Sequence, residues 1–160
     1  MTTTSPENDT PENDTTGAAV ECGRWDALGV PCRDIRQRVF VSEQGVPEEE
    51  EIDEQDADCL HFLLRFEGQP CGTARLLDDG HIGRVALLAA CRGRGLGRVL
   101  MQAVIDCACI RGMKACLLNA QTDAIGFYEA LGFKARGEVF MEAGIAHREM
   151  QLTMDSSNSA

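Results

Sequence analysis

The sequence predicts one α/β (α+β) domain with a mixed, mostly antiparallel sheet of about six to seven strands and helices on both faces. Three observations predict this fold. Alternating apolar residues with turn signals over 60–88 are typical of an antiparallel meander. A mostly apolar helical segment at 96–111 lies between two strand-like runs, as in a βαβ unit. Two more strand-like runs over 133–152 form a closing hairpin.

The chain has 160 residues, of which 44% are hydrophobic, which suits a single compact domain with its own core. We expect that domain to span residues 18–154. Residues 1–17 contain the direct repeat PENDT-PENDT and only polar or small side chains after Met1, so we expect a disordered acidic tail. We expect residues 155–160 to form a flexible C-terminus.

The first element of the domain is expected to be helical. Apolar residues recur at helical spacing over 25–41, which predicts one helix, or two short helices broken near Pro31. Residues 43–47 are then predicted to form a turn. The acidic run 48–58 is expected on a loop or on a solvated helical face.

The meander follows. Leu60, Phe62, Leu64 and Phe66 alternate onto one face of a strand, and residues 67–69 turn the chain into a second strand at 71–77. Asp79-Gly80 predicts a two-residue hairpin in which both central residues take positive φ. A third strand is expected at 81–88.

In the segment 96–111, the polar residues Arg98, Gln102 and Asp106 are four residues apart and form one narrow solvent-facing stripe. Because the rest of the helix surface is apolar, we expect the helix to be mostly buried. Gly112 ends it. A short central strand at 115–119 and a helix at 122–131 come next. The closing hairpin pairs 133–140 with 145–152 and turns at 142–144.

Charge and cysteine usage exclude several function classes. The formal net charge is −11, which argues against nucleic-acid binding and favours cationic acceptors such as amines. No apolar run approaches the roughly 20 residues that span a bilayer, and the N-terminus is too polar for a signal peptide. The eight cysteines form no C-x-x-C pair, so we expect reduced thiols, no metal site and a cytoplasmic location.

The segment Arg92-Gly93-Arg94-Gly95-Leu96-Gly97 is the strongest candidate site. It opens the buried helix, whose first N–H groups and partial positive charge suit an anion, and its glycines allow close approach of a phosphate. The loop lacks the full dinucleotide and P-loop signatures. From these residues alone, an anion site and a simple tight turn both remain open.

Four segments, in register across residues 18–154, resemble a known family. Arg92-x-x-Gly95-x-Gly97 resembles the Q/R-x-x-G-x-G/A signature of the GNAT acyltransferase superfamily. The run from Ala124 to Phe133 is similar to its A-x-x-F-Y-x-x-x-G-F hallmark. Residues 38–47 and 144–147 resemble the ElaA/YjcF-type branch. The resemblance implies the GNAT acyl-CoA N-acyltransferase fold.

The resemblance also implies how acetyl-CoA, as co-substrate, would bind. The loop would hold the CoA pyrophosphate, and pantetheine would pair with backbone between the splayed strands 84–88 and 115–119. The implied cofactor-binding residues are Val85, Ala86, Leu87, Arg92, Gly93, Arg94, Gly95, Leu96, Gly97, Asn119, Phe127 and Tyr128.

By the same resemblance, Tyr128 occupies the general-acid position. A phenol with a reference pKa of about 10 can protonate a departing thiolate, although an aromatic here could also simply pack the helix on the sheet. The strand before the loop carries no acid, so the base is left open. The candidates are His147, His61, His81, Glu43 or a water chain.

Arg75 and Arg84 are expected either to face the cleft and orient an acceptor or to pair with the acidic run. We therefore expect direct acetyl transfer, within a ternary complex, from acetyl-CoA to the primary amine of a small cationic acceptor. No metal, nucleic-acid or membrane partner is expected, and a homodimer is possible. The alternatives are a non-catalytic acyl-CoA-binding regulatory module and an N-acyl homoserine lactone synthase.

Overall fold

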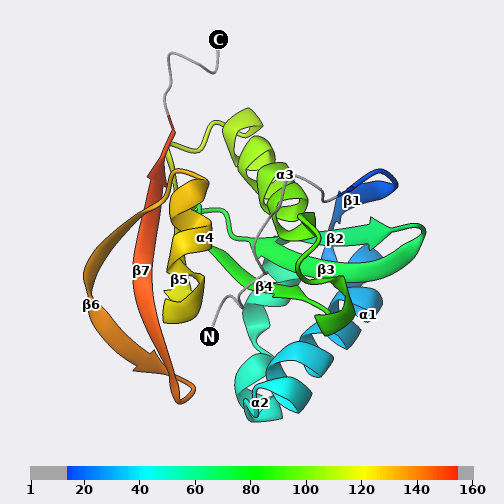
Figure 1. The fold of residues 1–160 in the computed structure, drawn as a ribbon, viewed down its shortest axis with the longest axis horizontal. Coiled ribbons are helices and arrows are strands. Elements are labelled where there is room, and N and C mark those ends of the chain that lie inside the picture. The colour runs from blue at the N-terminus through cyan, green and yellow to red at the C-terminus, as the bar shows by residue number, and fades with distance from the viewer. Residues whose placement is uncertain (1–13, 155–160) are drawn as a thin grey trace.

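The computed structural model describes residues 14–154 and contains two sheets that meet side by side (Figure 1). Most of the tail expected at 1–17, and the whole C-terminus expected at 155–160, lie outside the described residues. The first sheet has the order β1-β2-β3-β4 and the second the order β5-β7-β6, so the seven strands confirm the predicted fold class. The strands are β1 (Ala18–Gly23), β2 (Leu60–Phe66), β3 (Gln69–Leu76), β4 (Ile82–Leu87), β5 (Ala115–Gln121), β6 (Lys134–Glu142) and β7 (Ile145–Thr153).

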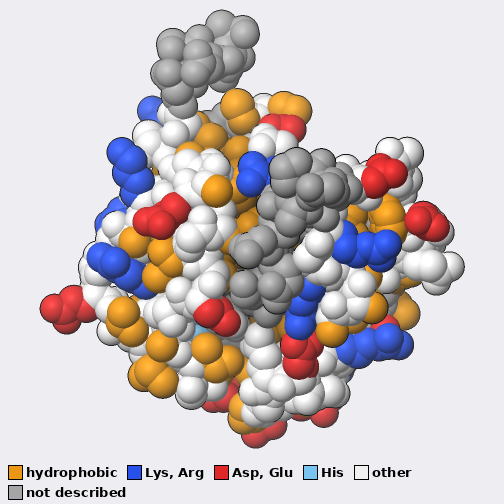
Figure 2. Space-filling model, in the orientation of Figure 1, with side chains coloured by type: hydrophobic (Ala, Val, Ile, Leu, Met, Phe, Trp, Pro, Cys, Tyr) orange, Lys and Arg blue, Asp and Glu red, His pale blue; other side chains and the backbone are white. Residues whose placement is uncertain are grey.

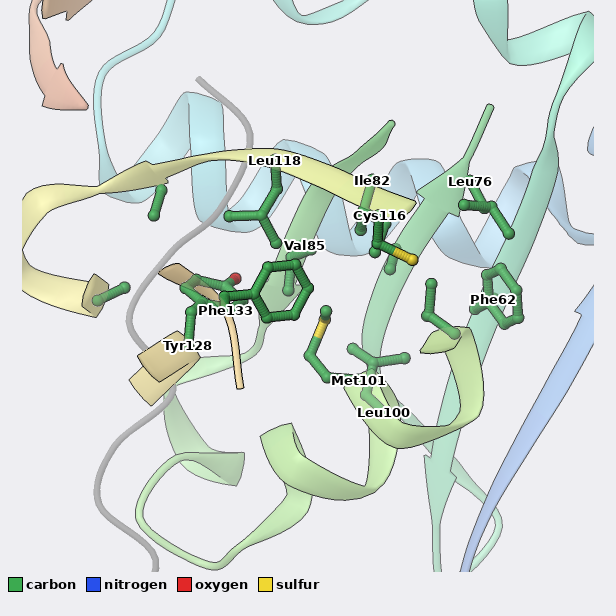
Figure 3. Packing of buried hydrophobic residues seen from close by; sticks show 14 of the residues in the cluster. Phe62, Leu76, Ile82, Val85, Leu100, Met101, Cys116, Leu118, Tyr128 and Phe133 are labelled. Atoms are coloured by element: carbon green, nitrogen blue, oxygen red, sulfur yellow. The ribbon is translucent and has the colours of Figure 1, made fainter. Parts of the chain in front are cut away.

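Helices cover both faces of this double sheet. α1 (Trp25–Arg36) packs on one face, and α3 (Leu96–Ile110) and α4 (Ile125–Ala130) pack on the other. β2 lies between them, so Phe62 and Leu64 face the α3 side while Leu63 faces α1, and both faces of this strand are buried. Figure 3 shows the larger core, on the α3 and α4 side. No helix in residues 14–154 combines the length and the hydropathy needed to cross a membrane.

α1 runs through Pro31 without a break, so of the two predicted alternatives the single helix is correct. Proline removes one backbone hydrogen bond from a helix interior. Here the buried residues Leu28, Cys32 and Ile35 pack on the sheet on both sides of Pro31, and this packing keeps the axis continuous. The chain then continues as a π-helical turn, Gln37–Glu43, before the short helix α2 (Glu48–Glu51) and a 3-10 segment, Glu54–Asp58.

The turn between β3 and β4 differs from the predicted two-residue hairpin. The Leu77 N–H donates to the His81 carbonyl at 2.8 Å, which leaves three residues in the loop, and of these only Gly80 has positive φ (95°). An added Cβ on Gly80 would lie 2.4 Å from the Ala115 carbonyl oxygen. Glycine is therefore required here by the close approach of the second sheet.

β4 and β5 run parallel but share only one bridge within residues 14–154, between His81 and Leu117. There the Leu117 N–H donates to the Gly80 carbonyl at 3.0 Å. Beyond this bridge the strands separate, and the splay opens toward Leu87 at the end of β4 and Gln121 at the end of β5.

The closing hairpin forms as expected, with positive φ at Ala143 (54°) and Gly144 (77°) in its turn. Its return strand β7 inserts between β5 and β6 rather than adding at the edge. Register therefore places His147 beside Gln121 of β5 on one side and beside Phe140 of β6 on the other.

Candidate active site

The N-terminus of α3 lies at the open end of the splay, directly after β4. Gly93 and Gly95 both have positive φ (75° and 80°), and Gly95 is the N-cap of the helix. Two such residues within three positions turn the backbone sharply into the helix, a conformation that glycine adopts without steric cost. The first N–H groups of a 15-residue helix therefore lie in this loop, where they favour an anion.

Basic side chains surround the same helix end. The Arg94 guanidinium stacks over the Phe66 ring of β2, 5.1 Å from its centroid, and Arg98 is exposed in the first turn. Figure 2 shows Lys and Arg side chains at the lower end of α3, where this loop lies. In a chain of net charge −11, this local excess of positive charge favours a phosphate group.

Arg92 has a different position from the other two arginines. Its Nε and Nη2 donate to the Leu87 carbonyl at 3.1 and 2.8 Å, and its guanidinium also forms an ion pair with Glu43. The side chain is only 14% exposed. Arg92 thus fixes the start of the loop to the end of β4.

The end of β4 presents backbone groups to the splay. The Leu88 N–H donates to the Cys71 carbonyl of β3 at 2.9 Å, and antiparallel pairing alternates along a strand. The Leu87 N–H and C=O therefore point away from β3, toward the splay, whereas Ala86 pairs with Thr73 of β3. The side chains of Val85, Ala86 and Leu87 are all buried, so only backbone is available to a ligand here.

Tyr128 projects from α4 toward Val85 of β4 and Leu118 of β5 (Figure 3). Its side chain is fully buried, and its ring makes edge-on contacts with Phe127 (5.0 Å) and Phe133 (5.8 Å). Tyr128 therefore has the packing role that the sequence left open. Its phenol lies between the two diverging strands.

Two of the candidate bases are committed to other contacts. Both carboxylate oxygens of Glu43 accept from Arg92, at 2.5 and 2.8 Å. His61 is buried against Trp25, and its Nε2 lies 2.8 Å from the Asp56 carbonyl oxygen. Since a carbonyl only accepts, Nε2 donates and has no lone pair for a substrate proton. These contacts make both residues structural.

The remaining histidines lie at opposite ends of the junction between the sheets. His81, at the bridge to Leu117, is 46% exposed and pairs with Asp79 at 3.0 Å. His147 is fully buried, and its ring stacks on Phe140. Burial lowers the pKa of His147 below its usual value, so the imidazole is neutral at pH 7.

Most of the acidic run is exposed as expected, but Glu51 and Asp56 are buried and, with the half-buried Asp53, belong to a network of ion pairs. Arg36, Arg75 and Arg84 form ion pairs with Glu51, Asp53 and Asp56, at N···O distances between 2.7 and 3.2 Å. The pairing predicted as one alternative for Arg75 and Arg84 is thereby confirmed. Three cations face three anions, so the network is balanced in charge.

Asp56, Cys59 and His61 place a carboxylate, a thiol and an imidazole within 4.8 Å of one another. Their chemistry does not suit a metal. Arg36 and Arg75 already bind Asp56, and burial raises the pKa of Cys59 to about 11. A metal would need to displace both guanidiniums and deprotonate this thiol.

Two cavities lie at the junction between the sheets, on the α1 face. The first, of about 280 Å³, extends from Ile82 and Gly83 of β4 to Asn119 of β5. The second, of about 450 Å³, extends from Arg84 of β4 to Glu142 in the closing hairpin. Gln55 and Arg75 line both cavities, so the two cavities adjoin, and we refer to them together as the groove.

A pair of amides crosses the open end of the splay. Gln121 Nε2 donates to Gln44 Oε1 at 3.0 Å, and Gln44 Nε2 lies 3.4 Å from Gln121 Oε1. Sequence reasoning missed this pair and also missed Glu142 and Gln55. Each belongs to a segment whose position depends on tertiary packing. The one available signal was an accumulation of polar residues next to turns.

Comparisons with known proteins agree on one family. The model of the acetyltransferase (GNAT) domain matches residues 17–154. A Bacillus subtilis (strain 168) protein named as an acetyltransferase is 42% identical over 130 residues, 78% of this chain and 88% of its own length. The N-acetyltransferase YjcF of the same organism is 38% identical over 120 residues, 72% of this chain and 86% of YjcF. The crystal structure of Escherichia coli ElaA superposes with a TM-score of 0.75 at 29% identity, covering 84% of this chain and 99% of ElaA.

Proposed function

The chain belongs to the acetyltransferase (GNAT) domain family, in its ElaA/YjcF-type branch, and on that premise we propose that it transfers an acetyl group from acetyl-CoA to the primary amine of a small cationic acceptor. The observation that carries this proposal is the junction between β4 and β5. A helix N-terminus with basic flanks lies at its open end, and a groove lined by several carboxylates runs along its other face.

The donor side of the proposal uses the loop and the splay. Gly93, Gly95, Leu96 and Gly97 would hold the CoA pyrophosphate through backbone N–H groups, with Arg94 and Arg98 supplying charge. Arg92 would contribute by holding the loop in place. The backbone from Val85 to Leu87 would align pantetheine, with Asn119, Phe127 and Tyr128 completing the channel. The co-substrate supplies the electrophilic thioester carbonyl.

The chemistry proposed needs one base and one acid. His147 Nε2 would accept a proton from the bound ammonium, and the neutral amine then attacks the thioester carbonyl carbon within a ternary complex. As the C–S bond breaks, Tyr128 would give its phenolic proton to the thiolate. The second amine proton would restore the phenol, so that one proton is released in each turnover.

The eight cysteines all carry free thiols, which supports a reducing, cytoplasmic setting for this activity. The alternative of a non-catalytic acyl-CoA-binding module makes a different prediction, because it requires binding without turnover.

Two measurements test the proposal. Acetyl-CoA at 100 times its Kd should stabilise the protein by about 2.7 kcal/mol in thermal unfolding. CoA thiol release should then appear with at least one amine in a panel of mono-, di- and polyamines. Stabilisation without turnover across that panel would favour the binding module. No stabilisation at millimolar acetyl-CoA would refute the donor site itself.

A further inference from the structure

His147 presents a buried lone pair to the closing hairpin. Its Nδ1 lies 2.7 Å from the Ile145 carbonyl oxygen, which can only accept, so Nδ1 carries the proton and Nε2 is the acceptor. Nε2 is buried and has no hydrogen-bond partner among residues 14–154. A buried polar atom in this state requires an explanation, because leaving it unsatisfied costs about 1–3 kcal/mol.

Glu142 Oε2 lies 3.9 Å from this nitrogen. A carboxylate oxygen and an imidazole lone pair are both acceptors, so they cannot bond to each other while His147 is neutral. One nitrogen that carries two or more hydrogens can donate to the His147 lone pair and to the carboxylate together, at about 2.8–3.0 Å from each acceptor. A protonated primary amine has this donor pattern and also carries the charge that a carboxylate attracts.

This pair of acceptors lies beside the groove on the α1 face. Glu142 and Ala143 line the cavity of about 450 Å³, and Arg84 of β4 lines it from the other sheet. Register places His147 next to Gln121, at the end of β5 that borders the splay. An amine held at this point is therefore next to the space where we have proposed that the thioester lies.

The same cavity carries a second negative charge at its rim. Glu50 lines it, is exposed, and makes no ion pair with any residue from 14 to 154. The nearby guanidiniums of Arg75 and Arg84 do not neutralise it, because they are bound to Glu51, Asp53 and Asp56. The Arg84 contact with Glu50 goes to the backbone carbonyl and leaves the carboxylate charge in place.

We propose that His147 Nε2 and Glu142 Oε2 together bind the reacting ammonium, and that Glu50 binds a second cationic group of the same acceptor. The acceptor class is then a diamine or a longer polyamine. This inference rests on the proposed function and deepens it. Glu142 becomes a catalytic residue in contact with the substrate, and Glu50 becomes the residue that selects its charge.

The test compares 1,5-diaminopentane with 1-aminopentane, with acetyl-CoA as donor. The wild-type chain should acetylate the diamine with at least tenfold higher kcat/KM. Glu142→Gln should lower kcat/KM at least tenfold for both amines. Glu50→Gln should lower it about tenfold for the diamine and less than twofold for the monoamine. Glu49→Gln is the matched control, since Glu49 is an exposed neighbour in the same acidic run that does not line the cavity.

A pH profile separates a direct role for Glu142 from a structural one. Glu142 from β6 and Asp123 from the segment before α4 both face His147 with negative charge, and such charge favours the imidazolium. Removing the Glu142 charge should therefore move the acid limb of kcat/KM to lower pH. A variant that only loosens the hairpin would lower activity without moving this limb.

Different results would overturn the proposed function and the inference on acceptor class. If no amine is acetylated, or acetyl-CoA does not stabilise the protein, the proposed function fails. If the wild-type chain acetylates amines but does not prefer the diamine, or if Glu142→Gln behaves like Glu49→Gln, the proposed function stands and the inference on acceptor class is overturned.

Discussion

The guanidinium of Arg92 and the carboxylate of Glu43 form a two-point ion pair, with N···O distances of 2.5 and 2.8 Å, between the loop before α3 and the end of the π-helical turn. The same guanidinium donates twice to the Leu87 carbonyl of β4. One side chain therefore joins three elements around the open end of the splay, and Glu43 acts through it as a positioning residue.

Glu43→Gln should accordingly weaken the donor site. Loss of the charge in a partly exposed pair costs about 1 kcal/mol, which corresponds to a KM for acetyl-CoA about fivefold higher. The pH profile of kcat should not change, because Glu43 takes no proton in this scheme. Steady-state kinetics at several pH values check both points, and a lost acid limb would instead identify Glu43 as the base.

Gly95→Val should abolish the stabilisation by CoA. Gly95 has φ of 80°, which a β-branched residue adopts at a cost of about 1–2 kcal/mol, and its side chain would occupy the proposed phosphate position. Gly112→Ala is the control, because it has nearly the same φ (79°) at the other end of α3 and open space around an added Cβ. Thermal unfolding with and without CoA should show a shift in the control only. Equal shifts in both variants would refute the loop assignment.

Tyr128→Phe should lower kcat by about 100-fold with little change in the KM for acetyl-CoA, since loss of a general acid typically costs a factor of 10² to 10⁴. Phe133→Leu serves as comparison, because it disturbs the packing of the Tyr128 ring while leaving the phenol in place. That variant should lose thermal stability and keep most of its kcat. Similar kcat values for Tyr128→Phe and the wild-type chain would leave the residue with a packing role alone.

Asp56→Asn should destabilise the fold by about 3–5 kcal/mol, because it leaves the buried guanidiniums of Arg36 and Arg75 without their shared partner. Asp34→Asn removes a comparable pair with Arg38 on the surface, where the Asp34 side chain is 58% exposed. It should cost less than about 1 kcal/mol. Urea denaturation of both variants measures the contrast, and equal losses would contradict the buried network.

Acid should destabilise the protein through the same carboxylates. Burial alone would raise the pKa values of Asp53 and Asp56, but bonds and charge from Arg75, with Arg36 also acting on Asp56, outweigh it and hold both pKa values below their usual range. Folded-state pKa values lower than the unfolded values mean that the stabilisation is complete above about pH 4 and is lost as pH falls below it. Denaturation at pH 7 and pH 3 should show this loss, with a smaller difference in Asp56→Asn.

Local patterns in the sequence were sufficient for most elements of the fold. The β2 alternation, the polar stripe on α3 and the stop at Gly112 depend on neighbouring residues, and each appears as expected. Tertiary packing decides two further points: which of the two alternatives holds at Pro31, and the form of the β3–β4 turn, where the prediction was wrong. Packing of α1 against the sheet outweighs the proline, and the approach of Ala115 determines the backbone at Gly80.

The candidate site also has parts that local sequence patterns predict and parts that depend on tertiary packing. The loop at 92–97 could be found because its function depends on consecutive residues. The acidic run could not be interpreted from composition, because Glu51 and Asp56 are buried only through arginines from α1, β3 and β4. Glu142 and His147 meet only because β7 inserts between β5 and β6, a strand order that no local pattern determines.

The single bridge between His81 and Leu117 also has a mechanical consequence. Apart from this bridge, no strand ladder within residues 14–154 joins the two sheets. The separation of β4 and β5 is instead set by packing in their shared core and by side chains that reach across the open end, such as the amides of Gln44 and Gln121. Single side-chain substitutions can therefore widen or narrow the space between β4 and β5 without disturbing the hydrogen bonds within either sheet.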